Sequence, residues 1–269
     1  MSSPIPQKKR FDPAVEFAKI REQYLSQASN NTFNALVLGR LGTGKTSSLA
    51  TLPKPLLINS FDPGGSKSLK KYIDDPKSGI YVESFENEDS KKPTEYAKWE
   101  KRFLQLKDDG AFDYFASYAV DSATTFTAAA LNEVLRAAGR AGTIPQIQDY
   151  QRMMSMMGHF VHMVNSMNVN FVMLGHLTLE KDELTGKITA VPLIVGKQKE
   201  TLPTLFDEVY IATAKPTSQG NTYTFLTQHE SYYEARSRLA SNGKLEKHEP
   251  QNFKEILKKT GYPYEDKKP

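Results

Sequence analysis

Residues 34–46 read Asn-Ala-Leu-Val-Leu-Gly-Arg-Leu-Gly-Thr-Gly-Lys-Thr, and this stretch decides how the chain folds. It opens with a short apolar run bounded by glycine, which predicts a buried strand. The part from Gly39 to Thr46 matches the pattern G-x-x-x-x-G-K-[ST] in full. A helix is predicted from Lys45 to Leu52, where Pro53 ends it. A strand, a glycine-rich loop and a helix in this order form the setting in which that pattern binds phosphate.

The loop predicts a site for a nucleoside triphosphate, taken to be ATP, together with Mg²⁺. Glycines let successive backbone N–H groups turn inward around phosphate oxygens, and the positive end of the helix dipole adds to their effect. In this pattern Lys45 reaches the β- and γ-phosphates, and the Thr46 hydroxyl ligates Mg²⁺. The residues predicted to bind the nucleotide are Gly39, Arg40, Leu41, Gly42, Thr43, Gly44, Lys45, Thr46 and Ser47.

A second metal ligand is expected at the end of a neighbouring buried strand. The apolar run 114–120 predicts such a strand, and Asp121 follows it directly. Asp121 therefore fits as the carboxylate that shares Mg²⁺ with Thr46. Its alternative role is that of a helix N-cap, because Ser122-Ala-Thr-Thr directly after it would start a helix.

Two further polar residues follow predicted strands. Asp62 comes shortly after the strand 55–59, and it is the nearest candidate for orienting the water that attacks the γ-phosphate. A turn residue ahead of Pro63 is its alternative role. His176 lies just after the strand 169–174, at the tip of the strand beside Asp121. There it would contact the γ-phosphate and report the loss of that phosphate. A packed, hydrogen-bonded histidine is the alternative there.

The whole pattern predicts an α/β fold. Strands that alternate with helices need crossover connections, and these give a mainly parallel twisted sheet flanked by helices. The expected strands are 34–38, 55–59, 80–85, 114–120, 169–174 and 208–213, with edge strands at 222–226 and 232–234. The expected helices are 12–28, 45–52, 93–107, 125–138, 147–167 and 253–259. We divide the chain into an N-terminal tail and helix (1–32), a core (33–240) and a C-terminal tail with a short helix (241–269).

Composition excludes several classes of protein. The chain has 269 residues, 39% of them hydrophobic, and no apolar run approaches the ~18 residues of a membrane span. The basic N-terminus lacks the apolar stretch of a secretory signal. The absence of cysteine excludes disulfides, cysteine zinc sites and thiol catalysis. A cytoplasmic protein is expected, and its net charge of +4 permits an anionic partner without requiring one.

The order of the motifs resembles the RecA-like ATPase core, and more narrowly the phage nucleotide-binding proteins built of little more than that core. The resemblance extends over residues 33–240. It rests on the phosphate loop, Ser60-Phe-Asp62, Tyr118-Ala-Val-Asp-Ser122 and Phe171-Val-Met-Leu-Gly-His176, with the phrases at 52–58 and 202–210 in support. Some of those phage proteins are single-strand annealing recombination ATPases. The resemblance therefore implies Mg²⁺-dependent ATP hydrolysis, a single-stranded DNA partner, a ring or filament of identical subunits, and the cytoplasm of a host bacterium.

The chain departs from the family pattern at two positions. The family typically has a catalytic glutamate shortly after the second strand, where this chain has Ser60-Phe-Asp62. Asp62 either substitutes for it with a shorter reach or leaves hydrolysis slow. The sensor position holds His176 where glutamine is more usual. Arg236 and Arg238 are candidate arginine fingers toward a neighbouring subunit's γ-phosphate, and solvated surface arginines are the alternative.

Two segments correspond to the DNA-facing loops of RecA-like recombinases, residues 137–149 and 177–199. Either they contact DNA phosphates or they are surface loops that bind nothing. Their basic residues, with close neighbours, are Arg136, Arg140, Arg152, Lys181, Lys187, Lys197 and Lys199. The basic run Lys8-Lys9-Arg10 is either a DNA-contacting arm or a solvated tail.

Three functions remain open at this point. The first is a recombination ATPase that acts on single-stranded DNA. The second is a phage packaging or replication accessory ATPase driven by a protein partner, such as a single-strand-binding or replication protein. The third is a nucleotide-gated assembly protein with negligible turnover. The base of the nucleotide and the number of subunits are not determined by the sequence.

Overall fold

The computed structural model describes residues 12–28, 32–218, 220–240 and 243–268. The chain divides into two compact units, Met1–Asn31 and Thr32–Pro269. The first unit contains one helix, α1 (Pro13–Ala28), as predicted. Its first turn is capped by Asp12, whose Oδ1 accepts a 3.1 Å hydrogen bond from the Ala14 N–H. The basic run at residues 8–10 lies outside the described residues.

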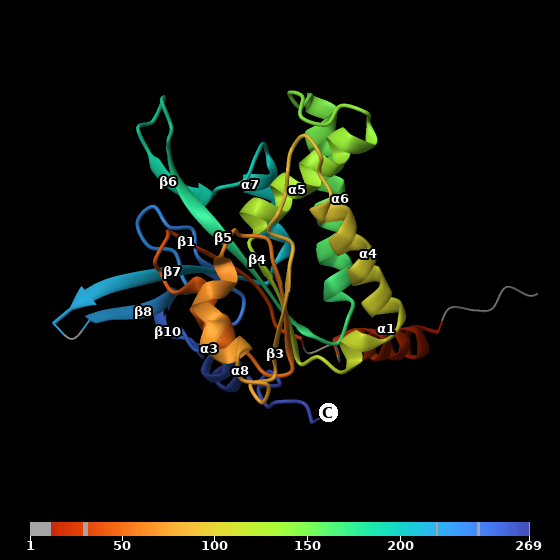
Figure 1. Ribbon diagram of the computed structural model, residues 1–269. Coiled ribbons are helices and arrows are strands. Elements are labelled where there is room, and N and C mark those ends of the chain that lie inside the picture. The colour runs from red at the N-terminus through yellow and green to blue at the C-terminus, as the bar shows by residue number, and fades with distance from the viewer. Residues whose placement is uncertain (1–11, 29–31, 219, 241–242, 269) are drawn as a thin grey trace, which may run out of the picture. The chain divides into compact units, whose positions relative to one another are not determined.

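The second unit is built on one large sheet with the strand order β10-β8-β7-β1-β5-β4-β2-β3 (Figure 1). The strands from β7 to β3 in this order pair in parallel, while β8 and β10 are added antiparallel at one edge. The predicted mainly parallel α/β fold is therefore confirmed. The strands are β1 (Asn34–Gly39), β2 (Leu56–Ser60), β3 (Ile80–Ser84), β4 (Ser117–Asp121), β5 (Asn170–Lys181), β6 (Ile188–Pro192), β7 (Glu208–Thr217), β8 (Gly220–Leu226), β9 (Arg236–Ser237) and β10 (His248–Pro250).

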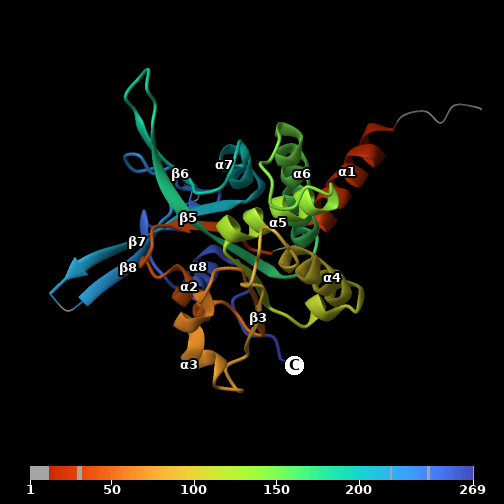
Figure 2. The same cartoon turned by 45° about the horizontal axis from the view of Figure 1, so that its top comes forward.

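Helices cover both faces of this sheet (Figure 2). On one face α4 (Glu95–Asp108), α5 (Ala123–Ala137) and α6 (Ile147–Asn165) bury an aromatic core that includes Trp99, Phe126 and Phe160. On the other face α2 (Lys45–Ser48), α3 (Lys70–Ile73) and α8 (Phe253–Thr260) pack over a second core. Alternate residues of β1 enter the two cores, since Leu36 joins the first and Val37 the second. The remaining short helices are α7 (Gln198–Thr201), η1 (Leu49–Thr51), η2 (Gly65–Leu69), η3 (Ala111–Asp113) and η4 (Leu202–Leu205).

The helix after the phosphate loop is shorter than predicted. The chain leaves α-helical geometry after Ser48 and continues as the 3-10 turn η1 to Thr51. The Ser48 hydroxyl donates to the Lys45 carbonyl at 2.6 Å, and the Thr51 hydroxyl donates to the Ser48 carbonyl at 2.7 Å. Such local side-chain bonds compete with a regular helix. With so short a helix, the loop's own N–H groups matter more for anion binding than the helix dipole does.

The expected loop at 177–199 is largely a β-hairpin. β5 continues past the end of the parallel sheet and pairs antiparallel with β6, from Leu177 opposite Pro192 to Lys181 opposite Ile188. In the turn, Asp182 Oδ1 accepts hydrogen bonds from the Leu184 and Thr185 N–H groups at 2.9 and 2.8 Å. The hairpin projects from the carboxyl end of the sheet (Figure 1). The edge strand expected at 232–234 is replaced by isolated bridges at Tyr233.

The C-terminal segment is part of the second unit. β10 pairs with β8, and the α8 side chains Phe253, Ile256 and Leu257 are fully buried in the second core. The Asn252 side chain caps α8 by accepting from the Glu255 N–H. Residues 243–268 are therefore not a free tail. None of the helices in the described ranges is long and apolar enough to cross a bilayer.

Candidate functional site

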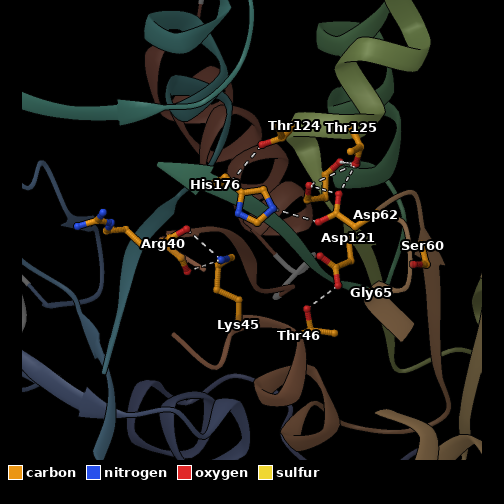
Figure 3. A network of polar contacts seen from close by, with 12 residues as sticks. Arg40, Lys45, Thr46, Ser60, Asp62, Gly65, Asp121, Thr124, Thr125 and His176 are labelled. Atoms are coloured by element: carbon orange, nitrogen blue, oxygen red, sulfur yellow. Dashed lines mark hydrogen bonds and ion pairs between the residues drawn. The ribbon is translucent and has the colours of Figure 1, made fainter. Parts of the chain in front are cut away.

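The residues predicted to bind phosphate lie at the carboxyl ends of the parallel strands (Figure 3). From Leu41 onward they line one pocket of about 400 Å³. Arg40 lines a neighbouring pocket together with His176, and Gly39 is not among the residues that line either pocket. The loop follows β1, Asp121 ends β4, Asp62 lies just beyond β2, and His176 is on β5. The pocket is lined by Leu41, Gly42, Thr43, Gly44, Lys45, Thr46, Ser47, Asp62, Pro63, Gly64, Gly65, Ser68, Asp121, His176 and Tyr223.

The glycines of the loop have a conformational role. Gly42 and Gly44 have φ angles of +75° and +81°, which residues other than glycine rarely adopt. A Cβ on Gly39 would lie 2.7 Å from Thr43 Oγ1 and 2.9 Å from the Ala212 carbonyl oxygen, so the loop must pack directly on β7. The Thr43 hydroxyl closes the turn by donating to the Arg40 carbonyl at 2.8 Å.

Lys45 lies across the mouth of the loop. Its side chain is buried, and Nζ donates to the carbonyl oxygens of Gly39 and Arg40 at 2.9 and 3.0 Å. Burial lowers the pKa of the Lys45 ammonium, and the charges of Asp121 and Asp62 partly oppose that shift. A buried cation held only by neutral carbonyls has capacity left for an anion, and phosphate oxygens meet that requirement.

Thr46 and Asp121 meet as the sequence predicted. The Thr46 hydroxyl donates to Asp121 Oδ2 at 2.7 Å, and Asp121 is 2% exposed. Burial raises the pKa of Asp121 to about 6, although the Thr46 hydrogen bond lowers it. Ser122, not Asp121, is the N-cap of α5, so the alternative role of Asp121 as a cap is wrong.

The donor set at Thr46 and Asp121 fits magnesium. Mg²⁺ takes oxygen ligands and is usually bound by one or two carboxylates together with substrate phosphates. One hydroxyl and one carboxylate meet here, beside a pocket of phosphate-binding character. Within the described residues there is no cluster of three or more His, Cys, Asp or Glu that could hold a metal without such a ligand.

Asp62 is the centre of a second hydrogen-bond network (Figure 3). Its Oδ1 accepts from the Ser122 and Thr125 hydroxyls at 2.7 and 2.5 Å, and its Oδ2 lies 3.1 Å from His176 Nε2. Burial alone would raise the pKa of Asp62, but the bonds from His176, Thr125 and Ser122 outweigh burial and lower it. Asp62 is therefore held as a carboxylate. Its backbone also forms the predicted turn, because the Asp62 carbonyl accepts from the Gly65 N–H at 2.8 Å.

His176 connects this network to the sheet. It lies opposite Gly39 in the β1–β5 register, and its backbone N–H donates to Thr124 Oγ1 at 3.1 Å. The side chain reaches Asp62 from the strand beside β4, which is the neighbour that the sequence predicted.

Sequence reasoning missed two supports of the site. Glu86 accepts from the Ser60 hydroxyl at 2.9 Å and from the Gly64 N–H at 2.7 Å, and so holds the chain on both sides of Asp62. Gln251 donates through Nε2 to the Thr43 carbonyl at 2.8 Å. Glu86 follows a predicted strand, as Asp62 does, and that signal could have found it. Nothing local marks Gln251.

The candidate arginine fingers are bound within their own unit. Arg236 donates to the carbonyls of Pro203 and Phe206 at 2.9 and 2.7 Å, and Arg238 pairs with Asp207 at 2.6 Å. Neither lines the phosphate pocket. Their predicted action on a neighbouring subunit stays a prediction.

Several of the cations expected near DNA have acidic partners. Arg136 pairs with Glu133, Arg140 with Asp149, and Lys199 with Glu180. Lys181 and Lys187 lie on the hairpin and have no ion pair with any described residue. Glu180, Asp182 and Glu183 lie on the same hairpin, and Asp182 interacts electrostatically with Lys187, so the hairpin has no net positive charge. DNA contact stays a prediction for both segments.

Comparison with known proteins adds a family and a distant structural likeness. A family model described as "AAA domain" matches residues 32–239. No curated protein matches the chain. Among solved structures, a KaiC-like protein from the hyperthermophilic archaeon Pyrococcus horikoshii OT3 is similar with a TM-score of 0.39 and 12% sequence identity, over 73% of this chain and 77% of that one.

Proposed function

The chain belongs to the AAA domain family of P-loop ATPases, and on that premise we propose that it binds ATP with Mg²⁺ at residues 39–47 and hydrolyses it. The proposal rests on one observation. Lys45 and Thr46 of α2, Asp121 of β4, Asp62 just beyond β2 and His176 of β5 converge on a single pocket.

Each of these side chains has a task suited to its environment. The loop N–H groups and Lys45 bind the phosphate oxygens. Thr46 and Asp121 hold Mg²⁺, which neutralises charge on those oxygens. Asp62 accepts a hydrogen bond from the attacking water and orients it toward the γ-phosphate. His176 Nε2 donates to Asp62 and keeps the carboxylate ionised and aimed.

A phosphate-release assay with Mg²⁺ and ATP tests this assignment. Lys45→Ala should lose ATP binding and turnover together. Asp62→Asn should still bind ATP, while turnover falls by roughly 10²-fold or more because the orienting carboxylate is gone. If Asp62→Asn hydrolyses ATP as fast as the wild type, Asp62 does not orient the water.

The finer proposal is that the protein acts on single-stranded DNA in phage-type recombination or annealing and that ATP turnover drives this action. The subunits would be assembled in a ring or filament. Two observations support it: β5 runs without a break from His176 into the hairpin, and the hairpin bears Lys181 and Lys187. We expect labelled single-stranded DNA to bind more weakly as salt rises and to stimulate turnover. Replacing both lysines by alanine should reduce both effects and leave basal turnover unchanged. Stimulation by a protein partner and not by DNA would instead select the packaging or replication role.

One observation also favours the third function, nucleotide-gated assembly with negligible turnover. The carboxylate of Asp62 has about four acceptor positions, and Ser122, Thr125 and His176 occupy three of them. One position is left for water. Wild-type phosphate release no faster than that of Lys45→Ala, together with normal ATP binding, would establish this function. Light scattering with and without a non-hydrolysable ATP analogue would then show whether the nucleotide changes the assembly.

A further inference from the structure

Tyr223 of β8 lines the phosphate pocket, and none of the functions above uses it. Its side chain is 41% exposed, although its ring packs against the loop. A Cβ on Gly44 would lie 2.9 Å from Tyr223 Cδ1, so the ring is in direct contact with the backbone of the loop. Among the described residues, no other aromatic ring packs against Tyr223. An exposed aromatic surface therefore borders the pocket.

Tyr223 lies at the opposite side of the loop from the catalytic network. In the sheet, β5, β4 and β2 lie on one side of β1, and they bring His176, Asp121 and Asp62. β7 and β8 lie on the other side, and β8 is two strands, or about 10 Å, from β1. If the γ-phosphate of a bound triphosphate faces Asp62, the nucleoside end therefore points past Gly44, toward the β8 side of the loop.

The Tyr223 end of the pocket does not suit phosphate. The lining residues with charged side chains are Lys45, Asp62, Asp121 and His176, and all belong to the other end or to the loop itself. At the Tyr223 end the neighbours are Gly44 and the Gln251 amide, whose Oε1 would lie 2.6 Å from a Gly44 Cβ. An uncharged aromatic ring beside neutral groups suits the flat base of a nucleotide, since every base offers a π-face for stacking.

We propose that Tyr223 is the stacking platform for the nucleotide's base, and that Gln251 and Gly44 fix its position against the loop. This assignment rests on the proposed ATP binding at residues 39–47. Stacking requires the ring and not the hydroxyl group, so phenylalanine should replace tyrosine and alanine should not. Stacking also tolerates different bases, so Tyr223 contributes affinity for ATP and GTP alike.

Calorimetry with two ligands separates the base from the phosphates. Binding of Mg²⁺ with a non-hydrolysable ATP analogue, and of Mg²⁺ with inorganic tripolyphosphate, is measured for the wild type, Tyr223→Ala and Tyr223→Phe. Tyr264→Ala is the matched control, because Tyr264 is 37% exposed and absent from the pocket. It follows Pro263, whose carbonyl accepts from Asn170 at the amino end of β5, away from the loop.

We expect Tyr223→Ala to weaken binding of the ATP analogue by roughly tenfold, or about 1.4 kcal/mol, and to leave binding of tripolyphosphate unchanged. Tyr223→Phe and Tyr264→Ala should bind both ligands as the wild type does. Unchanged affinity of Tyr223→Ala for the analogue would overturn the assignment. Equal losses for both ligands would also overturn it, because Tyr223 would then only hold the loop in shape. Failure of the wild type to bind the ATP analogue is a different result, which refutes the proposed ATP binding itself.

Discussion

Replacing Asp121 with asparagine should stabilise the protein at neutral pH when no metal is present. Asp121 is 2% exposed, and burial raises its pKa from 3.8 to about 6, against the effect of the Thr46 hydrogen bond. At 1.36 kcal/mol per pKa unit, ionising Asp121 in the folded protein costs about 3 kcal/mol more than in the unfolded chain. Asparagine is uncharged and can still accept the Thr46 hydrogen bond through Oδ1, so the variant avoids that cost.

The sign of the pH dependence follows from the two pKa values. Below 3.8 Asp121 is protonated in both states and its ionisation costs nothing. As the pH rises from 3.8 to about 6, the folded protein loses stability progressively, and the full cost is reached above about 6. The variant's advantage should therefore be about 3 kcal/mol near pH 7.5 and close to zero near pH 4.

Thermal unfolding in EDTA, followed by circular dichroism, measures this difference. Since 1 kcal/mol shifts Tm by ~2–4 °C in a domain of this size, Asp121→Asn should unfold roughly 6–12 °C above the wild type near pH 7.5. Asp62→Asn is the matched control and should shift Tm downward, because hydrogen bonds outweigh burial and lower the pKa of Asp62. A Tm for Asp121→Asn at or below that of the wild type near pH 7.5, or an advantage that persists near pH 4, would refute the reasoning.

Four other substitutions test the phosphate loop, the support of Asp62 and the attachment of the C-terminal segment. Gly44→Ala should abolish ATP binding in calorimetry, because φ of Gly44 is +81° and the new Cβ would lie 2.6 Å from Gln251 Oε1. The Cβ of Gly42→Ala meets nothing within 4 Å, so this variant should lose only about 1 kcal/mol of stability. Glu86→Ala leaves the Ser60 hydroxyl and the Gly64 N–H without their acceptor, and steady-state kinetics should show kcat roughly tenfold lower with ATP affinity retained. Lys267→Met removes a donor to three main-chain carbonyls, and urea titration should show a loss of about 1–2 kcal/mol.

The centre of the fold was predictable because its strands are apolar runs with clear ends. β1, β2, β4 and β7 are buried over all or half their length and appear in the sequence as short hydrophobic stretches. Polar residues that directly follow such strands must meet at one edge of a parallel sheet. For this reason Asp62, Asp121 and His176 could be placed together before their contacts were known.

The parts that could not be predicted depend on contacts between residues far apart in the chain. Gln251 lies 208 residues from Thr43, to which it donates, and no local pattern joins them. The C-terminal segment was expected to be a tail, because α8 is short and charged, yet its apolar side chains fill the second core. The hairpin was missed for a different reason. The resemblance to RecA-like recombinases predicts a DNA-facing loop at 177–199, while the alternating segment at Ile188 to Val191 is the signal for a strand.

The hairpin is anchored at His176, which contacts the Asp62 carboxylate. β5 leaves the parallel sheet at His176, and the returning chain bonds to the same residue, because the Leu193 N–H donates to the His176 carbonyl at 2.8 Å. Both strands of the hairpin are therefore fixed to one point, and that point is 3.1 Å from Asp62 through the imidazole. A displacement of His176 on loss of the γ-phosphate would move both strands together and could not be absorbed by one of them alone. Any partner that binds Lys181 and Lys187 would then receive that displacement directly. For this reason stimulation of ATP turnover by DNA or by a protein should disappear in His176→Ala, while ATP binding persists.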